Sequence, residues 1–185
     1  MTSLLSCLLG LQALDHLPRT GWVLRGVRDP ETVAGHVLGT AHLALALAPR
    51  VEPPLDLGRV LTLALVHDAP EAWTGDLPRP GGRHLPEGAK AAMEEGVART
   101  ELAPMGEHVV SGHAEYQAAK TREARFVRIC DRLQLGVCLL AYLRSGQLGL
   151  EEFVQGLEKL DASEFPILAE LAGELRDRIA EQLRH

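Results

Sequence analysis

Apolar residues recur with the period of an α-helix along most of the chain. The spacing i, i+3 or i+4, i+7 is clearest between residues 121 and 143, at Phe126, Ile129, Cys130, Leu133, Val137 and Leu140. Comparable patterns predict helices over residues 1–14, 30–48, 56–68, 87–102, 104–119, 150–160 and 163–183. The pattern therefore predicts an all-α protein with about seven to eight helices.

Capping residues set the expected starts of two helices. Asp29 is expected as an N-cap, with Pro30 at the first helical position after it, and Asp56 is expected to cap the next helix. The sequence Arg-Pro-Gly-Gly-Arg at residues 79–83 predicts a flexible basic loop instead.

Length and composition favour a single helical domain. Of the 185 residues, 46% are hydrophobic but only 4% are aromatic, and Leu and Ala dominate, which favours helices over strands. A chain of this length can bury a core without disulfides. We expect one globular domain over residues 1–185, with a core region at about 4–143 and C-terminal helices at 150–185 packed on it.

Charge and cysteine content exclude several classes of partner. The formal net charge is −6 and no long run of Lys or Arg occurs, so binding to a nucleic-acid polymer or to a membrane surface is not expected. No apolar run is long enough to span a membrane. Cys7, Cys130 and Cys138 lie in apolar segments without C-x-x-C spacing, which is typical of core residues in a reducing compartment. We expect a cytoplasmic protein, which could still bind a small phosphorylated ligand through a few arginines.

Ionisable residues interrupt three of the apolar segments. His67 and Asp68 follow the run Leu-Thr-Leu-Ala-Leu-Val at residues 61–66, His36 lies at the edge of an apolar helical face, and Asp131 lies within the most apolar helix. Burying such groups costs several kcal/mol unless they are paired or bound to a metal. Two imidazoles and two carboxylates could converge on one divalent ion and leave positions open for water and substrate. Five other histidines lack a partner at ligand spacing and are expected on the surface; they are His16, His84, His108, His113 and His185.

The order of these residues resembles the pattern H…HD…D of the HD-domain metal-dependent phosphohydrolase superfamily. More specifically, the chain is similar to the 5′-deoxynucleotidase-like branch. Arg19-Thr20-Gly21-Trp22 precedes the segment 29–36, and His67-Asp68-Ala69-Pro70-Glu71 precedes Gly75-Asp76-Leu77-Pro78. The four-part order is more specific than an isolated His-Asp pair.

This resemblance implies the metal ligands and the ion. By correspondence with the family pattern, His36, His67, Asp68 and Asp131 would hold a divalent ion such as Mn²⁺ or Co²⁺. The same correspondence implies that an all-α HD domain surrounds the ion.

The resemblance also implies the residues that act on the substrate. Glu71 would orient or deprotonate a water for attack on phosphorus, and Asp76 would contact the sugar or relay protons. Arg19 would hold the phosphate or a sugar hydroxyl, and Trp22 would form a wall on the sugar side. The implied reaction removes the 5′-phosphate from deoxynucleoside 5′-monophosphates.

Two departures from the family pattern leave other functions open. Gly35 and Val37 flank the first ligand where relatives carry acidic and polar residues, and Gln134 follows Asp131 where relatives often carry Glu. One alternative is hydrolysis of another phosphate ester, such as a deoxynucleoside triphosphate or a cyclic nucleotide. Another is a degenerate HD domain that binds a nucleotide without turnover. Relatives commonly form homodimers, for which the C-terminal helices could supply an apolar face.

Overall fold

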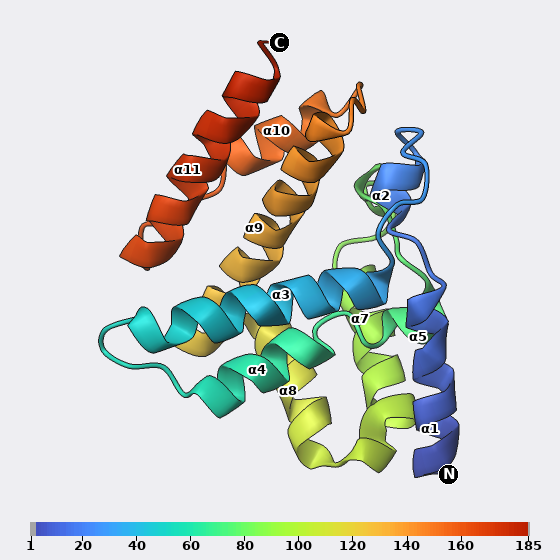
Figure 1. The fold of residues 1–185 in the computed structure, drawn as a ribbon. Helices are drawn as coiled ribbons and strands as arrows, with labels where there is room; N and C mark the ends of the chain where they lie inside the picture. Colours follow the sequence, from blue (N-terminus) through green and yellow to red (C-terminus); the bar gives the residue numbers. More distant parts are fainter. Residues whose placement is uncertain (1–2, 185) are drawn as a thin grey trace.

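The computed structural model describes residues 3–184 (Figure 1). Within that range the named secondary-structure elements are all helices, which are joined by turns and loops. Residues 1, 2 and 185, and with them the prediction for His185, lie outside the described part. The eight longer helices are α1 (Leu4–Leu11), α3 (Val33–Leu47), α4 (Leu57–Val66), α7 (Ala89–Val97), α8 (Glu107–Ala118), α9 (Arg122–Arg144), α10 (Glu151–Glu158) and α11 (Pro166–Gln182). Single turns form α2 (Thr20–Val23), α5 (Glu71–Thr74) and α6 (Arg79–Gly82). The predictions of an all-α fold and of seven to eight helices are confirmed.

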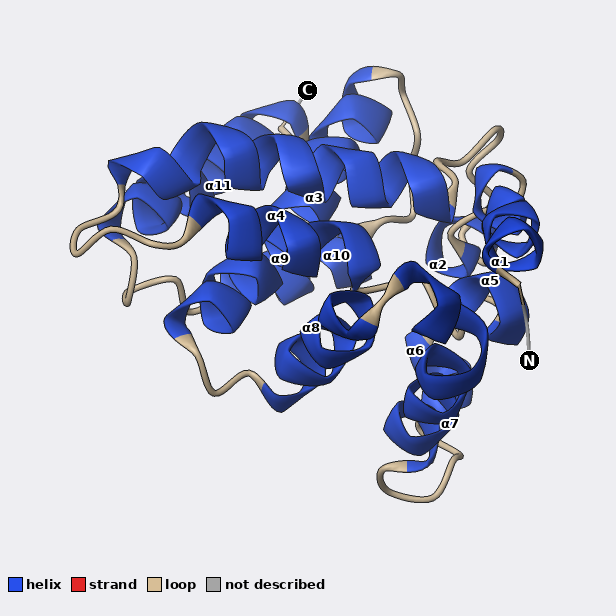
Figure 2. Ribbon diagram, turned by 90° about the horizontal axis from the view of Figure 1, so that it is seen from below, coloured by secondary structure: helices blue, strands red, loops and turns tan. Residues whose placement is uncertain are grey.

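Helix α9 lies at the centre of the fold, where α3, α4, α8, α10 and α11 all pack against it. The apolar stripe read from the sequence explains this position, because Phe126, Cys130 and Leu133 are fully buried. Phe126 meets Phe165 edge to face, with ring centroids 5.2 Å apart, and this contact joins α9 to the segment that leads into α11. Helices α10 and α11 lie at one end of the molecule, and α1 and α7 at the other (Figures 1 and 2).

The two N-cap predictions have different outcomes. Asp56 caps α4 as expected, because its Oδ1 accepts a hydrogen bond of 3.0 Å from the backbone N–H of Arg59. The N-cap predicted at Asp29 is wrong. Asp29 has a positive φ of 51°, and α3 begins four residues later with Thr32 as its N-cap, whose hydroxyl accepts from the N–H of Gly35 at 3.1 Å.

Contacts distant in sequence explain the later start of α3. The N–H of Arg19 donates to the carbonyl of Glu31 at 2.9 Å, and the N–H of Val33 donates to the carbonyl of Leu17 at 2.8 Å. These bonds hold the strand-like segment before α3 against the segment before α2, so local capping preference does not decide the helix start.

The basic segment at residues 79–83 forms the single turn α6 rather than an irregular loop. Pro78 precedes this turn and Pro80 lies within its first positions, where the fixed φ of proline suits a helix start. In the described part of the chain, each helix is too short or too polar to cross a membrane.

Candidate metal centre and adjoining cavity

Three helices bring the four predicted metal ligands to one place. His36 comes from α3, His67 and Asp68 from the end of α4, and Asp131 from the middle of α9. The Nε2 atoms of the two imidazoles are 3.3 Å apart. Asp68 Oδ2 lies 3.4 Å from His67 Nε2 and 3.7 Å from His36 Nε2, and Asp131 Oδ1 lies 3.1 Å from His36 Nε2. One ligand atom from each of His36, His67 and Asp68 falls within 4.8 Å of the other two.

The centre is closed on the imidazole side and open on the carboxylate side. His36 is fully buried and His67 is 2% exposed, whereas the side chains of Asp68 and Asp131 are 17% and 20% exposed. The imidazoles are therefore shielded from solvent, while the two carboxylates border the space that a ligand can enter.

Hydrogen bonds to the far ring nitrogens direct both Nε2 atoms at the centre. His67 Nδ1–H donates to the carbonyl of Ala64 at 2.8 Å, and His36 Nδ1–H donates to Gln134 Oε1 at 2.5 Å. Since neither oxygen acceptor can donate, both Nδ1 atoms carry the hydrogen, and each Nε2 is left to bind a proton or a metal.

Gln134 is itself oriented by a carboxylate. Its Nε2 donates to Glu31 Oε2 at 2.7 Å, and the other oxygen of Glu31 accepts from Trp22 Nε1 at 3.0 Å. This arrangement turns the amide oxygen of Gln134 toward His36. A continuous chain of hydrogen bonds thus runs from Trp22 to the metal centre.

The charges of the cluster call for a cation at its centre. Burial alone would lower the pKa of His67, but Asp68, Asp131 and the hydrogen bond to the Ala64 carbonyl together raise the pKa to about 9. Burial would raise the pKa of Asp68, yet the charges of His67 and Arg19 hold it well below its usual range. A divalent ion at this point could bind both imidazoles and balance the negative charge of both carboxylates. Imidazole nitrogen and carboxylate oxygen are donors suited to divalent transition metals, so the residues fit such an ion.

Glu71, at the first position of α5, lies buried beside the cluster. Its Oε1 is 3.3 Å from Lys90 Nζ, whereas its Oε2 is buried without a hydrogen-bond partner in the described chain and lies 3.7 Å from Arg19 Nη1. Burial and then the charge of Asp68 raise the pKa of Glu71 to about 8. A carboxyl group with this pKa is mostly protonated at neutral pH, and its free oxygen becomes able to accept a proton as the pH rises through about 8.

Arg19 and Asp76 are bound to each other at the edge of the centre. Arg19 Nη1 donates to Asp68 Oδ2 at 3.0 Å and to Asp76 Oδ1 at 3.1 Å. The second oxygen of Asp76 accepts from the backbone N–H of Thr20 at 2.6 Å. Asp76 therefore fixes both the start of α2 and the Arg19 guanidinium.

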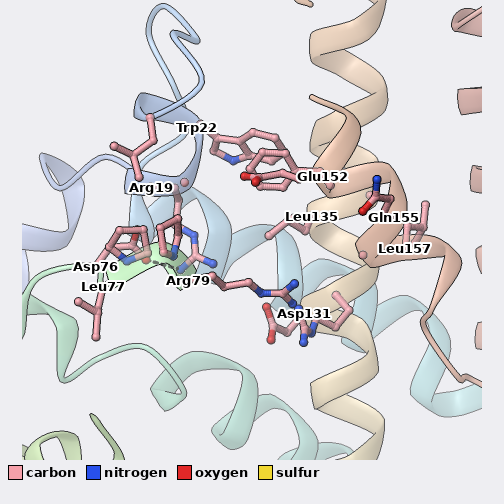
Figure 3. A pocket seen from close by; sticks show the side chains of 18 of the residues that line it. Arg19, Trp22, Asp76, Leu77, Arg79, Asp131, Leu135, Glu152, Gln155 and Leu157 are labelled. Carbon is pink, nitrogen blue, oxygen red and sulfur yellow. Dashed lines mark hydrogen bonds and ion pairs between the residues drawn. The ribbon is translucent and has the colours of Figure 1, made fainter. Parts of the chain in front are cut away.

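A cavity of about 350 Å³ adjoins the centre and is bordered by α2, α6, α9 and α10 (Figure 3). Arg19, Asp76 and Asp131 line this cavity and also a second one, of about 520 Å³, which contains Asp68 and Glu71. Trp22 lines the first cavity but is only 1% exposed, because it stacks on Phe153 of α10 with centroids 3.9 Å apart. Trp22 therefore forms part of the wall behind Phe153.

Several residues at the centre had not been expected from the sequence. The hydroxyl of Tyr116 donates to Asp131 Oδ2 at 3.0 Å, and Lys90 links Glu71 to Glu94, whose Oε1 lies 3.1 Å from Lys90 Nζ. The i, i+4 pair Lys90 and Glu94 was the available signal, but such pairs are also common on solvent-exposed helix faces.

The prediction that His113 lies on the surface is wrong. His113 is fully buried, because α8 packs closely on α4 at Gly112, where an added Cβ would lie 3.4 Å from Thr62. His16, His84 and His108 are exposed or half-exposed, in keeping with the expectation.

The fold and the site together are those of an all-helical protein in which His36, His67 and Asp68 lie close enough to share one ion, with Asp131 beside His36. Residues 11–167 match the model of the HD-domain family, and the chain belongs to that family. The resemblance noted in the sequence is thereby confirmed, and the family and the donor set together imply a divalent metal ion.

Relatives of the chain include named nucleotidases. It is 28% identical to "5′-deoxynucleotidase hdd1" of Schizosaccharomyces pombe over 77% of this chain and 75% of that protein. It is 35% identical to "5′-deoxynucleotidase HDDC2" of Xenopus laevis over 70% of this chain and 64% of that protein. The match therefore spans slightly less than two thirds of the frog protein.

Solved structures share the fold over nearly the whole chain. The crystal structure of the PH0347 protein from Pyrococcus horikoshii superposes with a TM-score of 0.82 at 29% identity, and covers 95% of this chain and 99% of that one. With 95% of this chain covered, the superposed part extends into the C-terminal helices.

Proposed function

We propose that this protein is a metal-dependent 5′-deoxynucleotidase that removes the 5′-phosphate from deoxynucleoside 5′-monophosphates. The observation that carries the proposal is the convergence of His36, His67, Asp68 and Asp131 beside the buried carboxylate of Glu71. Membership of the HD-domain family and similarity to proteins named 5′-deoxynucleotidase support the reaction and the substrate class.

In this proposal His36, His67, Asp68 and Asp131 hold a divalent ion such as Mn²⁺ or Co²⁺. The bound ion supplies Lewis-acid chemistry, because it lowers the pKa of water and offsets the negative charge of a phosphate. The chain contributes by presenting both Nε2 atoms without hydrogens.

Glu71 is the proposed general base. Its Oε2 has no hydrogen-bond partner in the described chain and can accept a proton from the attacking water, while Lys90 holds Oε1 in place. Lys90 and Arg19 then lie close enough to stabilise the carboxylate again after it loses the proton.

Arg19 is proposed to bind the phosphate. Its two described hydrogen bonds both leave from Nη1, so the other donors of the guanidinium are available for phosphate oxygens. Asp76 supports this role by holding Nη1, and its position in both cavities also allows a contact with the sugar. Trp22 supports the sugar side of the cavity through its stack on Phe153.

The departure at Gln134 favours a working centre over a degenerate binding domain. The amide oxygen of Gln134 accepts the hydrogen bond from His36 Nδ1, as a carboxylate would in the relatives that carry Glu there. Gly35 and Val37 precede and follow His36 on α3 and do not remove a partner from the imidazole.

We also propose that the protein works in the cytoplasm and forms a homodimer. An apolar face on α1 supports association, because Leu4, Leu5, Leu8 and Leu9 are each at least 44% exposed. This face, rather than the C-terminal helices, is the better candidate for the contact. Sedimentation at several concentrations measures the oligomeric state.

The test of the activity is a phosphate-release assay over all deoxy- and ribonucleoside 5′-monophosphates with Mn²⁺, Co²⁺, Mg²⁺ or Zn²⁺ supplied in turn. The proposal expects orthophosphate from the deoxynucleotides. Release of pyrophosphate or tripolyphosphate from nucleoside triphosphates would instead identify another bond as the target. Thermal stabilisation by nucleotides without phosphate release under any metal would show a binding domain.

A further inference from the structure

Besides Arg19, four basic side chains line the 350 Å³ cavity, and one of them, Arg79, also lines the second cavity with Asp68 and Glu71. They are Arg79 and Arg83 from the segment around α6, Arg132 from α9 and Lys159 from the end of α10. Within residues 3–184 none of the four makes an ion pair or a side-chain hydrogen bond. Glu152, the carboxylate that lines the same part of the cavity, is already paired with Arg25. With Arg19, the lining carries five basic side chains against the three carboxylates of Asp76, Asp131 and Glu152, an excess of positive charge in a chain whose formal net charge is −6.

Arg79 reaches into this cavity from α6. Figure 3 shows its side chain extending from the neighbourhood of Arg19 toward Asp131. It passes close to α10, because a Cβ added at Gly156 would lie 4.0 Å from Arg79 Nη1. Burial and then the charge of Arg132 lower the pKa of Arg79, so the two guanidinium groups repel each other. An anion between them would remove that repulsion.

A single phosphate at the metal centre does not occupy all of these cations. Arg19 and Arg79 both line the cavity that contains Asp68 and Glu71, whereas Arg83, Arg132 and Lys159 line only the 350 Å³ cavity, into which the nucleoside would extend. Sugars and bases are neutral and would leave the charges of Arg79 and Arg132 without a partner. A nucleotide with a further phosphate would supply one.

We propose that Arg79 and Arg132 form an anion subsite that binds a second phosphate group of the nucleotide, while the first phosphate is attacked at the metal centre. This inference rests on the proposed function and extends its substrate class to nucleotides with two phosphate groups. Arg83 and Lys159 add positive charge at the edge of the subsite. The second phosphate is either on the 3′ oxygen or is the β-phosphate of a 5′-diphosphate. In the 3′,5′-bisphosphate, water would displace the 5′ oxygen and release orthophosphate and the nucleoside 3′-monophosphate. In the 5′-diphosphate, water would displace the β-phosphate from the α-phosphorus and release orthophosphate and the 5′-monophosphate.

The test compares three substrates of the manganese-loaded enzyme: deoxyadenosine 5′-monophosphate, its 5′-diphosphate and deoxyadenosine 3′,5′-bisphosphate. Arg79→Ala and Arg132→Ala should each raise KM for one of the doubly phosphorylated nucleotides about tenfold or more, the scale of one lost charge-assisted hydrogen bond. For Arg132→Ala, whose side chain lines only the 350 Å³ cavity, KM for the monophosphate should change less than about twofold. Arg178→Ala serves as the control, because Arg178 pairs with Glu174 on α11 and does not line the cavity.

Unequal effects on the 3′,5′-bisphosphate and the 5′-diphosphate would identify which phosphate occupies the subsite. Equal effects on all three substrates would overturn the proposal, because the arginines would then serve the attacked phosphate. A loss that depends on the base of the monophosphate would also overturn it and assign the arginines to base recognition.

A binding measurement separates this inference from the proposed reaction. Pyrophosphate titrated into the metal-free protein should raise the melting temperature of the wild type and of Arg178→Ala, but not of the double variant Arg79→Ala/Arg132→Ala. If this difference appears while no deoxynucleotide is hydrolysed, the proposed function fails and the subsite stands. If monophosphates are hydrolysed but pyrophosphate stabilises all three proteins equally, only the subsite fails.

Discussion

The metal centre and the cavity beside it differ in how their charged groups are held. At the centre, His36 and His67 each have a fixed partner on Nδ1, and Asp131 is held by Tyr116. In the cavity, Arg79 and Arg132 have no ion-pair partner among the described residues. The difference indicates two tasks, because a preorganised centre can stabilise a reaction without rearranging, whereas unpaired cations are suited to a charged ligand that arrives and leaves.

Removal of a metal ligand is expected to have the largest effect. His67→Ala and Asp68→Ala should each abolish metal binding and lower kcat/KM by about a thousandfold or more, the scale for loss of a central catalytic group. Metal content after dialysis and the rate of phosphate release measure both effects. His108→Ala is the matched control, since His108 is exposed and lies outside both cavities. A ligand variant that loses the metal but still hydrolyses deoxynucleotides would contradict the assignment of the centre.

Glu71→Gln should separate proton transfer from metal binding. The amide keeps the size of the side chain but cannot accept a proton, so kcat should fall about 10²- to 10⁴-fold, the usual contribution of a general base. Metal affinity should stay near that of the wild type, because Glu71 is not among the four proposed ligands. Titration with Mn²⁺ beside steady-state kinetics gives both values, and an unchanged kcat would exclude Glu71 as the base.

The orientation of His36 can be tested by exchanging the amide and the carboxylate that hold it. Gln134→Leu removes the acceptor of His36 Nδ1–H and also leaves Oε2 of Glu31 without its donor. Metal affinity should fall about 10- to 100-fold, as is typical when the hydrogen bond behind a metal-binding histidine is lost. In the wild type, Gln134 Nε2 and Glu31 Oε2 are 2.7 Å apart. Gln134→Glu alone would replace this hydrogen bond by two carboxylates that repel each other.

The double variant Glu31→Gln/Gln134→Glu should restore metal affinity. The new amide at position 31 could still accept from Trp22 Nε1 and would donate to the new carboxylate at position 134. That carboxylate would accept from His36 Nδ1–H, so every hydrogen bond of the chain is retained. Competition titration with a metal indicator measures the affinities, and NMR of the metal-free protein reports the imidazole tautomer of His36. If the double variant binds metal no better than Gln134→Glu, the hydrogen-bond chain does not position the ligand.

The four proposed ligands could be recognised in the sequence because each interrupts an apolar helical segment. Asp131 is the clearest example, since it lies beside Cys130 in the most buried stripe of the chain. Lys90 and Tyr116 were missed for the opposite reason. They belong to amphipathic helices whose polar faces look solvent-exposed in the sequence, and only the packing of α7 and α8 shows that these faces meet at the centre.

The helices themselves followed largely from local patterns, and the errors arose where distant segments pair. The start of α3 could not be predicted from Asp29, because the bonds from Arg19 and Val33 that fix this segment join residues before α2 to residues before α3. The basic cavity was missed likewise. Arg79 and Arg132 are 53 positions apart in the sequence, and α10 closes the cavity from a third segment.

The smallest expected effect concerns the start of α3, which lies one turn before His36. Thr32→Ala should lower the free energy of unfolding by about 1 kcal/mol, because the N–H of Gly35 loses its acceptor, whereas Thr32→Ser should cost less than about 0.5 kcal/mol. Urea denaturation of the metal-free proteins measures both values. If hydrogen bonds at the far ring nitrogen position His36, metal affinity should be unchanged in Thr32→Ala even though the helix is less stable. A parallel loss of metal affinity would mean that the start of α3, and not Gln134, holds His36 in place. The rigidity of the centre, in contrast to the adaptable cavity, would then come from the backbone of α3.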